Sequence, residues 1–195
     1  MRDASLSGRD ILAPPNLVSA ARLALVPVAL VLIAGGHRAA AVWTLAAMVA
    51  TDGLDGYLAR RLSRVTELGK VLDPLADKVA IDAVLGLLAA RGEFPAWAFW
   101  LVLGRDVSIV AGAVWLRARI RAVPASIGIG KVALVALAAM TIVYVADLRA
   151  LEMWLLVAGV AAVIVSGVAY AALAVRWHRD GNRGGARSDE REARR

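Results

Sequence analysis

The stretch TDGLDGYLARRLSRVTELGKVLDPLADKVAI, residues 51–81, places four aspartates between two apolar segments. These aspartates are Asp52, Asp55, Asp73 and Asp77. Spacings of three and four residues put each pair on one face of a helix. The two helices predicted here are consecutive and antiparallel, so their ends can bring the pairs together. The stretch therefore predicts two helices that carry four carboxylates at a shared end.

The chain as a whole has the composition of a membrane protein. It has 195 residues, 60% of them hydrophobic, and a mean hydropathy of +0.66, which is unusually apolar for a soluble domain. A helix needs about 20 apolar residues to span a bilayer. Segments that qualify are 16–35, 39–60, 71–90, 94–117, 125–146 and 151–175. We predict an all-α membrane domain with six transmembrane helices, residues 1–176, and a basic disordered tail, residues 177–195.

Basic residues are distributed unequally between the two sets of predicted loops. Seventeen fall in the two tails and in the second and fourth loops, while the other loops hold three, Arg38, Arg91 and Arg149. By the positive-inside rule, both termini are cytoplasmic. The net charge of +7 thus reflects topology, and without a recognisable binding motif it does not indicate nucleic acid. Tryptophans at the predicted helix ends fit an interfacial belt; they are Trp43, Trp97, Trp100 and Trp154 at one side, Trp115 and Trp177 at the other.

Four carboxylates in a low dielectric repel one another unless a cation compensates them. Nearby Arg60 and Lys78 are too few to do so. Oxygen ligands without Cys or His favour Mg²⁺ or Mn²⁺, with Ca²⁺ as a further option. Two such ions would suit phosphoryl transfer. The alternative is a set of structural ion pairs or water-exposed helix ends, but four acids with Gly53, Gly56 and Gly69 beside them favour a metal site.

The same residues resemble the signature of the CDP-alcohol phosphatidyltransferase family, D-x2-D-G-x2-A-R-x8-G-x3-D-x3-D. Every fixed position is present: Asp52, Asp55, Gly56, Ala59, Arg60, Gly69, Asp73 and Asp77. The segment PNLVSAARLALVP, residues 15–27, is also similar to the first helix of bacterial phosphatidylglycerophosphate synthases in that family. The resemblance implies a six-helix, CDP-alcohol phosphotransferase-like fold over most of the chain.

The resemblance also implies a reaction and its residues. A phosphatidyl group passes from CDP-diacylglycerol to an alcohol and CMP is released, as part of phospholipid biosynthesis. Asp52, Asp55, Asp73 and Asp77 would bind two metal ions, Mg²⁺ or Mn²⁺, and Asp77 would also deprotonate the acceptor hydroxyl. The CDP group would lie against Asp52, Gly56, Ala59, Arg60 and Gly69.

Charges elsewhere in the predicted helices bear on the acceptor alcohol. Arg105 and Lys131 are candidate contacts for a phosphorylated acceptor, although Arg105 would alternatively pair with Asp82 or Asp106. The resemblance favours sn-glycerol 3-phosphate as acceptor. GRDVSIVAGAVWLRAR, residues 104–119, is instead similar to cardiolipin synthases of the family, which use phosphatidylglycerol. Lys131 is followed by Val132, Ala133 and Leu134, where the glycerophosphate enzymes usually have a second Lys and a Thr. Inositol phosphate is a third option.

A divalent-cation transporter would also place carboxylates in membrane helices. Transporter sites usually lie near the bilayer midplane between internal repeats, whereas these acids cluster near one surface and no repeat is visible. An inactive scaffold is a further alternative, which the intact motif disfavours. We therefore expect an enzyme in the inner membrane of a bacterium, with its site facing the cytoplasm. Small residues in several helices are compatible with a homodimer.

Overall fold

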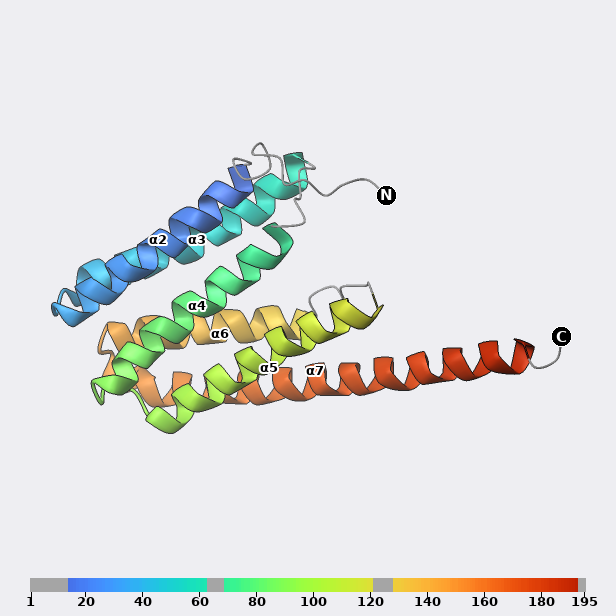
Figure 1. The fold of residues 1–195 in the computed structure, drawn as a ribbon. Coiled ribbons are helices and arrows are strands. Elements are labelled where there is room, and N and C mark those ends of the chain that lie inside the picture. The colour runs from blue at the N-terminus through green and yellow to red at the C-terminus, as the bar shows by residue number, and fades with distance from the viewer. Residues whose placement is uncertain (1–13, 63–68, 121–127, 193–195) are drawn as a thin grey trace.

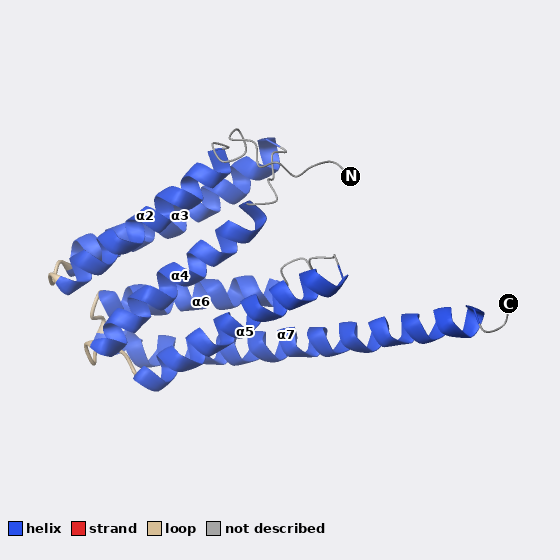
Figure 2. Ribbon diagram, in the orientation of Figure 1, coloured by secondary structure: helices blue, strands red, loops and turns tan. Residues whose placement is uncertain are grey.

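The computed structural model describes residues 14–62, 69–120 and 128–192, with side chains in 20–51, 78–112, 128–173 and at Val175. The described residues form six α-helices and no strand (Figures 1 and 2). They are α2 (Pro14–Ala34), α3 (Arg38–Leu62), α4 (Gly69–Ala90), α5 (Ala96–Ile120), α6 (Gly128–Val145) and α7 (Arg149–Glu192). Each of these helices overlaps one of the segments predicted from hydropathy. The predicted all-α class is confirmed.

The last helix differs from the sequence prediction. Residues 177–195 were expected to be disordered, but α7 continues as a helix to Glu192 and extends beyond the other helices (Figure 1). Once a helix is long, each added residue gains a hydrogen bond without a new nucleation step. Opposite charges three residues apart, such as Asp180 with Arg183 and Arg187 with Glu190, also favour a helix.

Three tight turns, residues 35–37, 91–95 and 146–148, lie together at one end of the molecule, here called the hairpin end (Figure 1). Each of the preceding helices ends in a Schellman motif. After α2, for example, His37 N–H donates to the Leu32 carbonyl at 2.8 Å and Gly36 N–H donates to the Ile33 carbonyl at 3.1 Å. The left-handed residues are Gly36 (φ 78°), Gly92 (φ 73°) and Asp147 (φ 54°). These turns make α2–α3, α4–α5 and α6–α7 antiparallel pairs.

The two central helices are α4 and α6. Helix α4 packs against α2, α5 and α6, and α6 packs against α3, α4 and α7. Figure 1 shows the α2–α3 pair on one side of α4, with α5 and α7 on the other. Alanines with no exposed surface permit close approach of the helices; they are Ala29, Ala41, Ala98 and Ala133. The larger buried side chains at these contacts include Leu85, Leu88, Leu137 and Met140.

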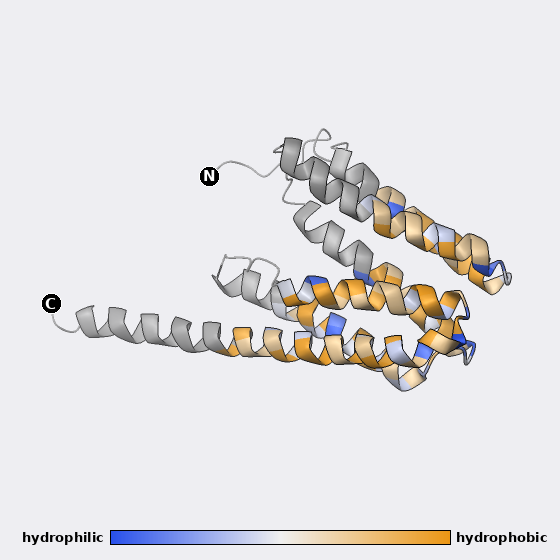
Figure 3. Ribbon diagram, turned by 180° about the vertical axis from the view of Figure 1, so that it is seen from behind, coloured by the Kyte–Doolittle hydropathy of each residue, from blue (hydrophilic) through white to orange (hydrophobic). Residues whose placement is uncertain are grey.

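The described parts of the helices consist mostly of hydrophobic residues (Figure 3), and many of the large ones are exposed. Within the described side chains, two stretches are long and apolar enough to cross a membrane: Gly128–Val145, with hydropathy 2.0, and Arg149–Leu173, with hydropathy 2.3. Large apolar residues on α7 point outward, including Val157, 60% exposed, and Val168, 64% exposed. Such a surface is consistent with a membrane protein, because a soluble protein rarely exposes continuous apolar area.

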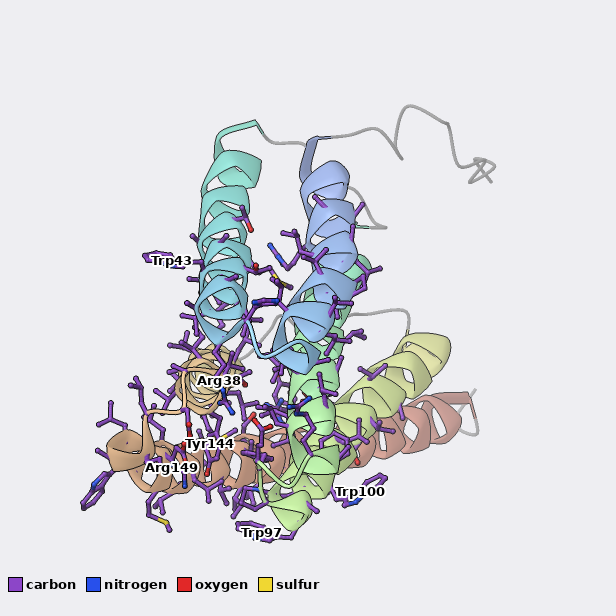
Figure 4. All side chains as sticks on the ribbon, turned by 90° about the vertical axis from the view of Figure 1, so that its left-hand side faces the viewer. Arg38, Trp43, Trp97, Trp100, Tyr144 and Arg149 are labelled. Carbon is purple, nitrogen blue, oxygen red and sulfur yellow. The ribbon has the colours of Figure 1, made fainter. Side chains whose placement is uncertain are left out.

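Exposed tryptophans cluster toward the hairpin end. Trp97 is 60% exposed and Trp43 is 76% exposed, and both extend outward from the ribbon, as does Trp100 (Figure 4). With Trp154 they lie in the first two turns of α3, α5 and α7. The predicted placement of these four is confirmed, whereas the side chains of Trp115 and Trp177 are outside the described residues.

Arginines and one glutamate connect the turns of the hairpin end. Arg38 Nη2 lies 2.9 Å from Glu93 Oε2, and Arg91 Nε lies 2.8 Å from Glu93 Oε1. Arg91 also donates to the Ala34 carbonyl at 3.3 Å, and Arg38 to the Val145 carbonyl at 3.4 Å. These bonds place cations on the carbonyls that end α2 and α6, where the helix dipole favours positive charge. We call Arg38, Arg91 and Glu93 the hairpin clamp.

Candidate active site

The motif residues lie on two helices that the backbone describes. Asp52, Asp55, Gly56, Ala59 and Arg60 belong to α3. Gly69 is the first residue of α4, and Asp73 and Asp77 follow in its first turns. The side chains of these residues are outside the described ones. Their assignment to metal and CDP therefore stays a prediction.

The helix that carries the first aspartate pair is regular up to the motif. Thr51 is the last described side chain before it, and its hydroxyl donates to the carbonyls of Ala47 and Met48, each at 2.9 Å. A threonine hydroxyl that is satisfied inside its own helix needs no partner from another element. The backbone of α3 thus continues from this bond into Asp52 without a break.

A buried polar network begins one residue after the last motif aspartate. Lys78 Nζ, on α4, lies 2.5 Å from Asp106 Oδ1, on α5. The same oxygen accepts from Arg105, whose second terminal nitrogen donates to the hydroxyl of Ser166 on α7. Asp106 is 4% exposed and Ser166 is fully buried. The network therefore links three helices through charged groups that are largely shielded from the surroundings.

A second carboxylate balances the charge of this network. Asp82 lies one helical turn after Lys78 on α4 and interacts electrostatically with Asp106, Lys78 and Arg105. Its Oδ1 is buried and accepts no hydrogen bond. Two cations and two carboxylates sum to zero formal charge, which reduces the cost of holding them in a low dielectric.

The two acceptor candidates have different surroundings. Arg105 has the internal pairing that the sequence left as an alternative: its partners are Asp106 and Ser166, and Asp82 lies nearby. Lys131 is exposed at the start of α6 and joins none of the salt bridges of the described residues. Contact of either residue with an acceptor remains a prediction.

Helix α7 runs past both acceptor candidates. A Cβ on Gly130 would lie 2.7 Å from Tyr170 Oη, so the start of α6 can approach α7 this closely because residue 130 is glycine. Tyr170 follows Ser166 by one helical turn. Arg105 bonds to Ser166, and Lys131 follows Gly130 directly. Arg105 and the residue before Lys131 therefore contact adjacent turns of α7, at Ser166 and Tyr170.

The side chains available as ligands decide where a metal ion could bind. Among the described side chains, no group of three or more His, Cys, Asp or Glu could hold one. The motif supplies four carboxylates, which are the donors that Mg²⁺ and Mn²⁺ prefer. The chemistry of these residues therefore fits a divalent ion, whose ligands would be Asp52, Asp55, Asp73 and Asp77.

The sequence revealed only part of the buried network. Lys78 and Asp82 stand four residues apart, so their shared helix face was a usable signal. Asp106 is one of the two carboxylates that the sequence offers as a partner of Arg105. No sequence signal pointed to Ser166, because a serine in an apolar helix is common and its partner comes from another helix. Arg22, within the predicted segment 16–35, is buried at 3% exposure.

Comparison with known proteins agrees with the motif. The profile of the CDP-alcohol phosphatidyltransferase family matches residues 12–165. A protein from Mycobacterium tuberculosis named probable phosphatidylglycerophosphate synthase is 34% identical over 173 residues, 83% of this chain and 81% of that protein. A Bacillus subtilis protein named CDP-diacylglycerol–glycerol-3-phosphate 3-phosphatidyltransferase is 33% identical over 111 residues, 49% of this chain and 57% of that protein.

A third relative carries a different name. The CMP-forming cardiolipin synthase of Streptomyces coelicolor is 39% identical over 106 residues, 51% of this chain and 49% of that protein. The matches to the Bacillus and Streptomyces proteins thus span about half of their length. The family profile covers most of the chain and includes all eight motif positions. The chain belongs to the CDP-alcohol phosphatidyltransferase family.

Proposed function

We propose that the protein transfers a phosphatidyl group from CDP-diacylglycerol to sn-glycerol 3-phosphate, with release of CMP. The observation that carries this proposal is the complete motif on α3 and α4 within the family match. The names of the Bacillus and Mycobacterium relatives support the glycerophosphate acceptor.

Seven of the eight motif residues have an assigned part in this reaction. Asp77 accepts the proton of the acceptor hydroxyl. The hydroxyl oxygen attacks the phosphorus that bears the lipid alcohol, and the bond from that phosphorus to CMP breaks. The four aspartates would hold divalent ions, whose positive charge would offset the pyrophosphate and the departing CMP. Arg60 pairs with phosphate, and Gly56 and Ala59 leave room for cytidine.

Two cations support a phosphorylated acceptor. Lys131 is exposed and forms no ion pair with the described residues. Arg105 is committed to Asp106 and Ser166 through its terminal nitrogens, but its Nε is buried without a hydrogen-bond partner. Arginine and lysine both bind phosphate well. We assign Lys131 as the primary acceptor contact and Arg105 as the second.

The proposed topology has six membrane spans, with both termini in the cytoplasm of a bacterium and the site at the inner leaflet. The hairpin end holds Arg38, Arg91 and Arg149 and the exposed tryptophans. The remaining basic loops and tails of the sequence would lie on the cytoplasmic side. CDP-diacylglycerol would enter from the bilayer and the polar acceptor from water. A homodimer is compatible with this arrangement.

One observation favours a second acceptor. The Streptomyces relative is named a cardiolipin synthase, and Val132 after Lys131 is apolar and 66% exposed. An apolar neighbour would suit phosphatidylglycerol, whose acyl chains remain in the bilayer. Lys131 would then contact the phosphate of that lipid.

CMP release by the purified protein tests the proposal. CDP-diacylglycerol and Mg²⁺ or Mn²⁺ are supplied with glycerol 3-phosphate, phosphatidylglycerol or inositol phosphate, one acceptor at a time. Release with glycerol 3-phosphate alone is the expected result. Release with phosphatidylglycerol alone would identify that lipid as the acceptor in place of glycerol 3-phosphate. The absence of CMP release with all three acceptors would contradict the proposed function. Metal uptake by sealed vesicles without CMP release would indicate the transporter alternative.

A further inference from the structure

We propose that Lys78 is a positioning residue: its ion pair with Asp106 fixes the rotation of α4 about its axis, and so the direction of the motif aspartates on that helix. This inference rests on the proposed function for the role of Asp73 and Asp77. It assigns a task to Lys78, Asp106 and Ser166, which the proposed reaction does not otherwise use.

The contacts of Lys78 lead to fixed points on two other helices. Its Nζ lies 2.5 Å from Asp106 Oδ1 on α5, and Asp106 also accepts from Arg105. Arg105 then donates to Ser166 on α7. The side chains of Lys78, Arg105 and Asp106 are 17%, 10% and 5% exposed. Because each member is held by another, Lys78 is tied to a rigid anchor rather than to a mobile surface carboxylate.

Because Lys78, Asp73 and Asp77 share one helix, the position of Lys78 also determines the direction of the two aspartates. Asp77 precedes Lys78 directly, so about 100° of rotation and 1.5 Å of rise separate their Cα atoms. A rotation of α4 that moves Lys78 turns Asp73 and Asp77 by the same angle. With side-chain tips about 6 Å from the helix axis, a rotation of about 20° moves a carboxylate by about 2 Å. Mg²⁺ requires oxygen ligands at about 2.0–2.1 Å in near-octahedral geometry, so this displacement would disrupt the site.

The contact between α4 and α5 has an apolar part and a charged part. Toward the hairpin end, Gly86 faces the ring of Phe99, and a Cβ there would lie 3.2 Å from Phe99 Cε2. This contact brings the helices close together, but a smooth apolar surface tolerates small rotations. The directional Lys78–Asp106 bond lies two turns away, on the side of the motif. In coiled coils, a single buried polar residue specifies the register of neighbouring helices at a cost in stability.

The test measures Mn²⁺ binding by electron paramagnetic resonance on the purified full chain, without substrates. Lys78→Met removes the charge and keeps most of the stem. We expect it to weaken Mn²⁺ binding about tenfold or more, the usual range for residues that orient metal ligands. With substrates present, kcat should fall about a hundredfold, while the KM for CDP-diacylglycerol changes by less than about threefold. Lys78→Arg should regain most of the Mn²⁺ affinity.

Arg38→Met is the matched control. It removes a cation from an ion pair at the hairpin end, far along the helices from the motif, with a side chain 37% exposed against 17% for Lys78. It should lower the thermal midpoint without changing Mn²⁺ affinity. Ser166→Ala is the milder second variant, which removes the anchor of Arg105 and should weaken Mn²⁺ binding about two- to fourfold. Ser166→Ala replaces Lys78→Met as the test variant if Lys78→Met does not fold.

The outcomes separate this inference from the proposed function. Unchanged Mn²⁺ affinity in folded Lys78→Met, or in Ser166→Ala if Lys78→Met does not fold, would overturn the positioning role. Equal weakening in Arg38→Met would do the same, because the effect would then be general destabilisation. A wild-type chain that binds Mn²⁺ but releases no CMP would instead contradict the proposed function, and Mn²⁺ affinity would still decide the role of Lys78.

Discussion

The guanidinium of Arg38 lies 2.9 Å from the carboxylate of Glu93 and also donates to the Val145 carbonyl. This one side chain thereby joins the start of α3 to the turn after α4 and to the end of α6. Arg91, bonded to Glu93 and to the Ala34 carbonyl, extends the connection to the end of α2. Beside it, the rings of Phe94 and Tyr144 meet edge to face with centroids 4.8 Å apart. In Figure 4, Arg38 and Tyr144 lie close together at this end.

The hairpin clamp should make stability depend on pH. The hydrogen bond from Arg91, together with the charge of Arg38, lowers the pKa of Glu93 despite partial burial of its carboxyl. A carboxylate with a lowered pKa stabilises the fold above its unfolded pKa, about 4.3, and this contribution is lost as the pH falls through the lower folded pKa. Thermal midpoints in detergent should therefore drop for the wild type below about pH 4.3.

Glu93→Gln tests that linkage. The variant should have a lower midpoint than the wild type at pH 7, by about 2 °C, as expected for a partly exposed pair. The two midpoints should converge as the pH falls. A gap that stays constant down to acid pH would mean that ionisation of Glu93 does not contribute.

The turn between α6 and α7 uses aspartate where the other two turns use glycine. Asp147 has φ 54°, a left-handed conformation that costs a residue with Cβ about 1 kcal/mol. Its ion pair with Arg149, at 3.4 Å with Arg149 83% exposed, offsets little of this. Asp147→Gly should therefore raise the thermal midpoint by about 1–3 °C. The matched control is Gly92→Ala: it places a Cβ at φ 73° with nothing within 4 Å and should lower the midpoint by strain alone.

Gly130 and Tyr170 should behave as a pair. A Cβ at residue 130 would lie 2.7 Å from Tyr170 Oη and 3.4 Å from two ring carbons. Gly130→Ala should therefore displace the ring and lower the midpoint. Tyr170→Phe in the same chain should restore part of the loss, because the closest clashing atom is gone. In Gly112→Ala, where a Cβ would meet nothing within 4 Å, helix propensity should raise stability by up to about 1 kcal/mol. Additive effects of the two changes at 130 and 170 would contradict the contact.

Asp77→Asn should separate binding from turnover. The amide cannot accept the proton of the acceptor hydroxyl, so CMP release should fall about 10²- to 10⁴-fold. Binding of Mn²⁺ and CDP-diacylglycerol should be largely retained, because α4 keeps its rotation and three motif carboxylates stay in place, whereas Lys78→Met turns both α4 aspartates. Asp147→Asn, the same exchange at the hairpin end, provides the control for both assays. Turnover near the wild-type level in Asp77→Asn would exclude Asp77 as the base.

The sequence by itself determined the helices and the family. Hydropathy indicated the apolar helices, because a membrane span requires an uninterrupted apolar length. The spacing from Asp52 to Asp77 is a local pattern that requires no tertiary information. Placement of Trp43, Trp97 and Trp154 near helix ends followed from the same lengths. The end of α7 was missed, because glycine and charge suggest disorder while helix propagation depends on the segment that precedes it.

Only the tertiary structure decided which charges meet. Arg105 had two candidate carboxylates in the sequence, and its bond to Asp106 depends on how α4, α5 and α7 pack. The hairpin clamp likewise joins residues as far apart as Arg38 and Val145. A single sequence records which ionisable groups must be compensated, because buried charge is costly. The partner of each group depends on helix rotation and neighbours, which side-chain packing fixes only after the helices assemble.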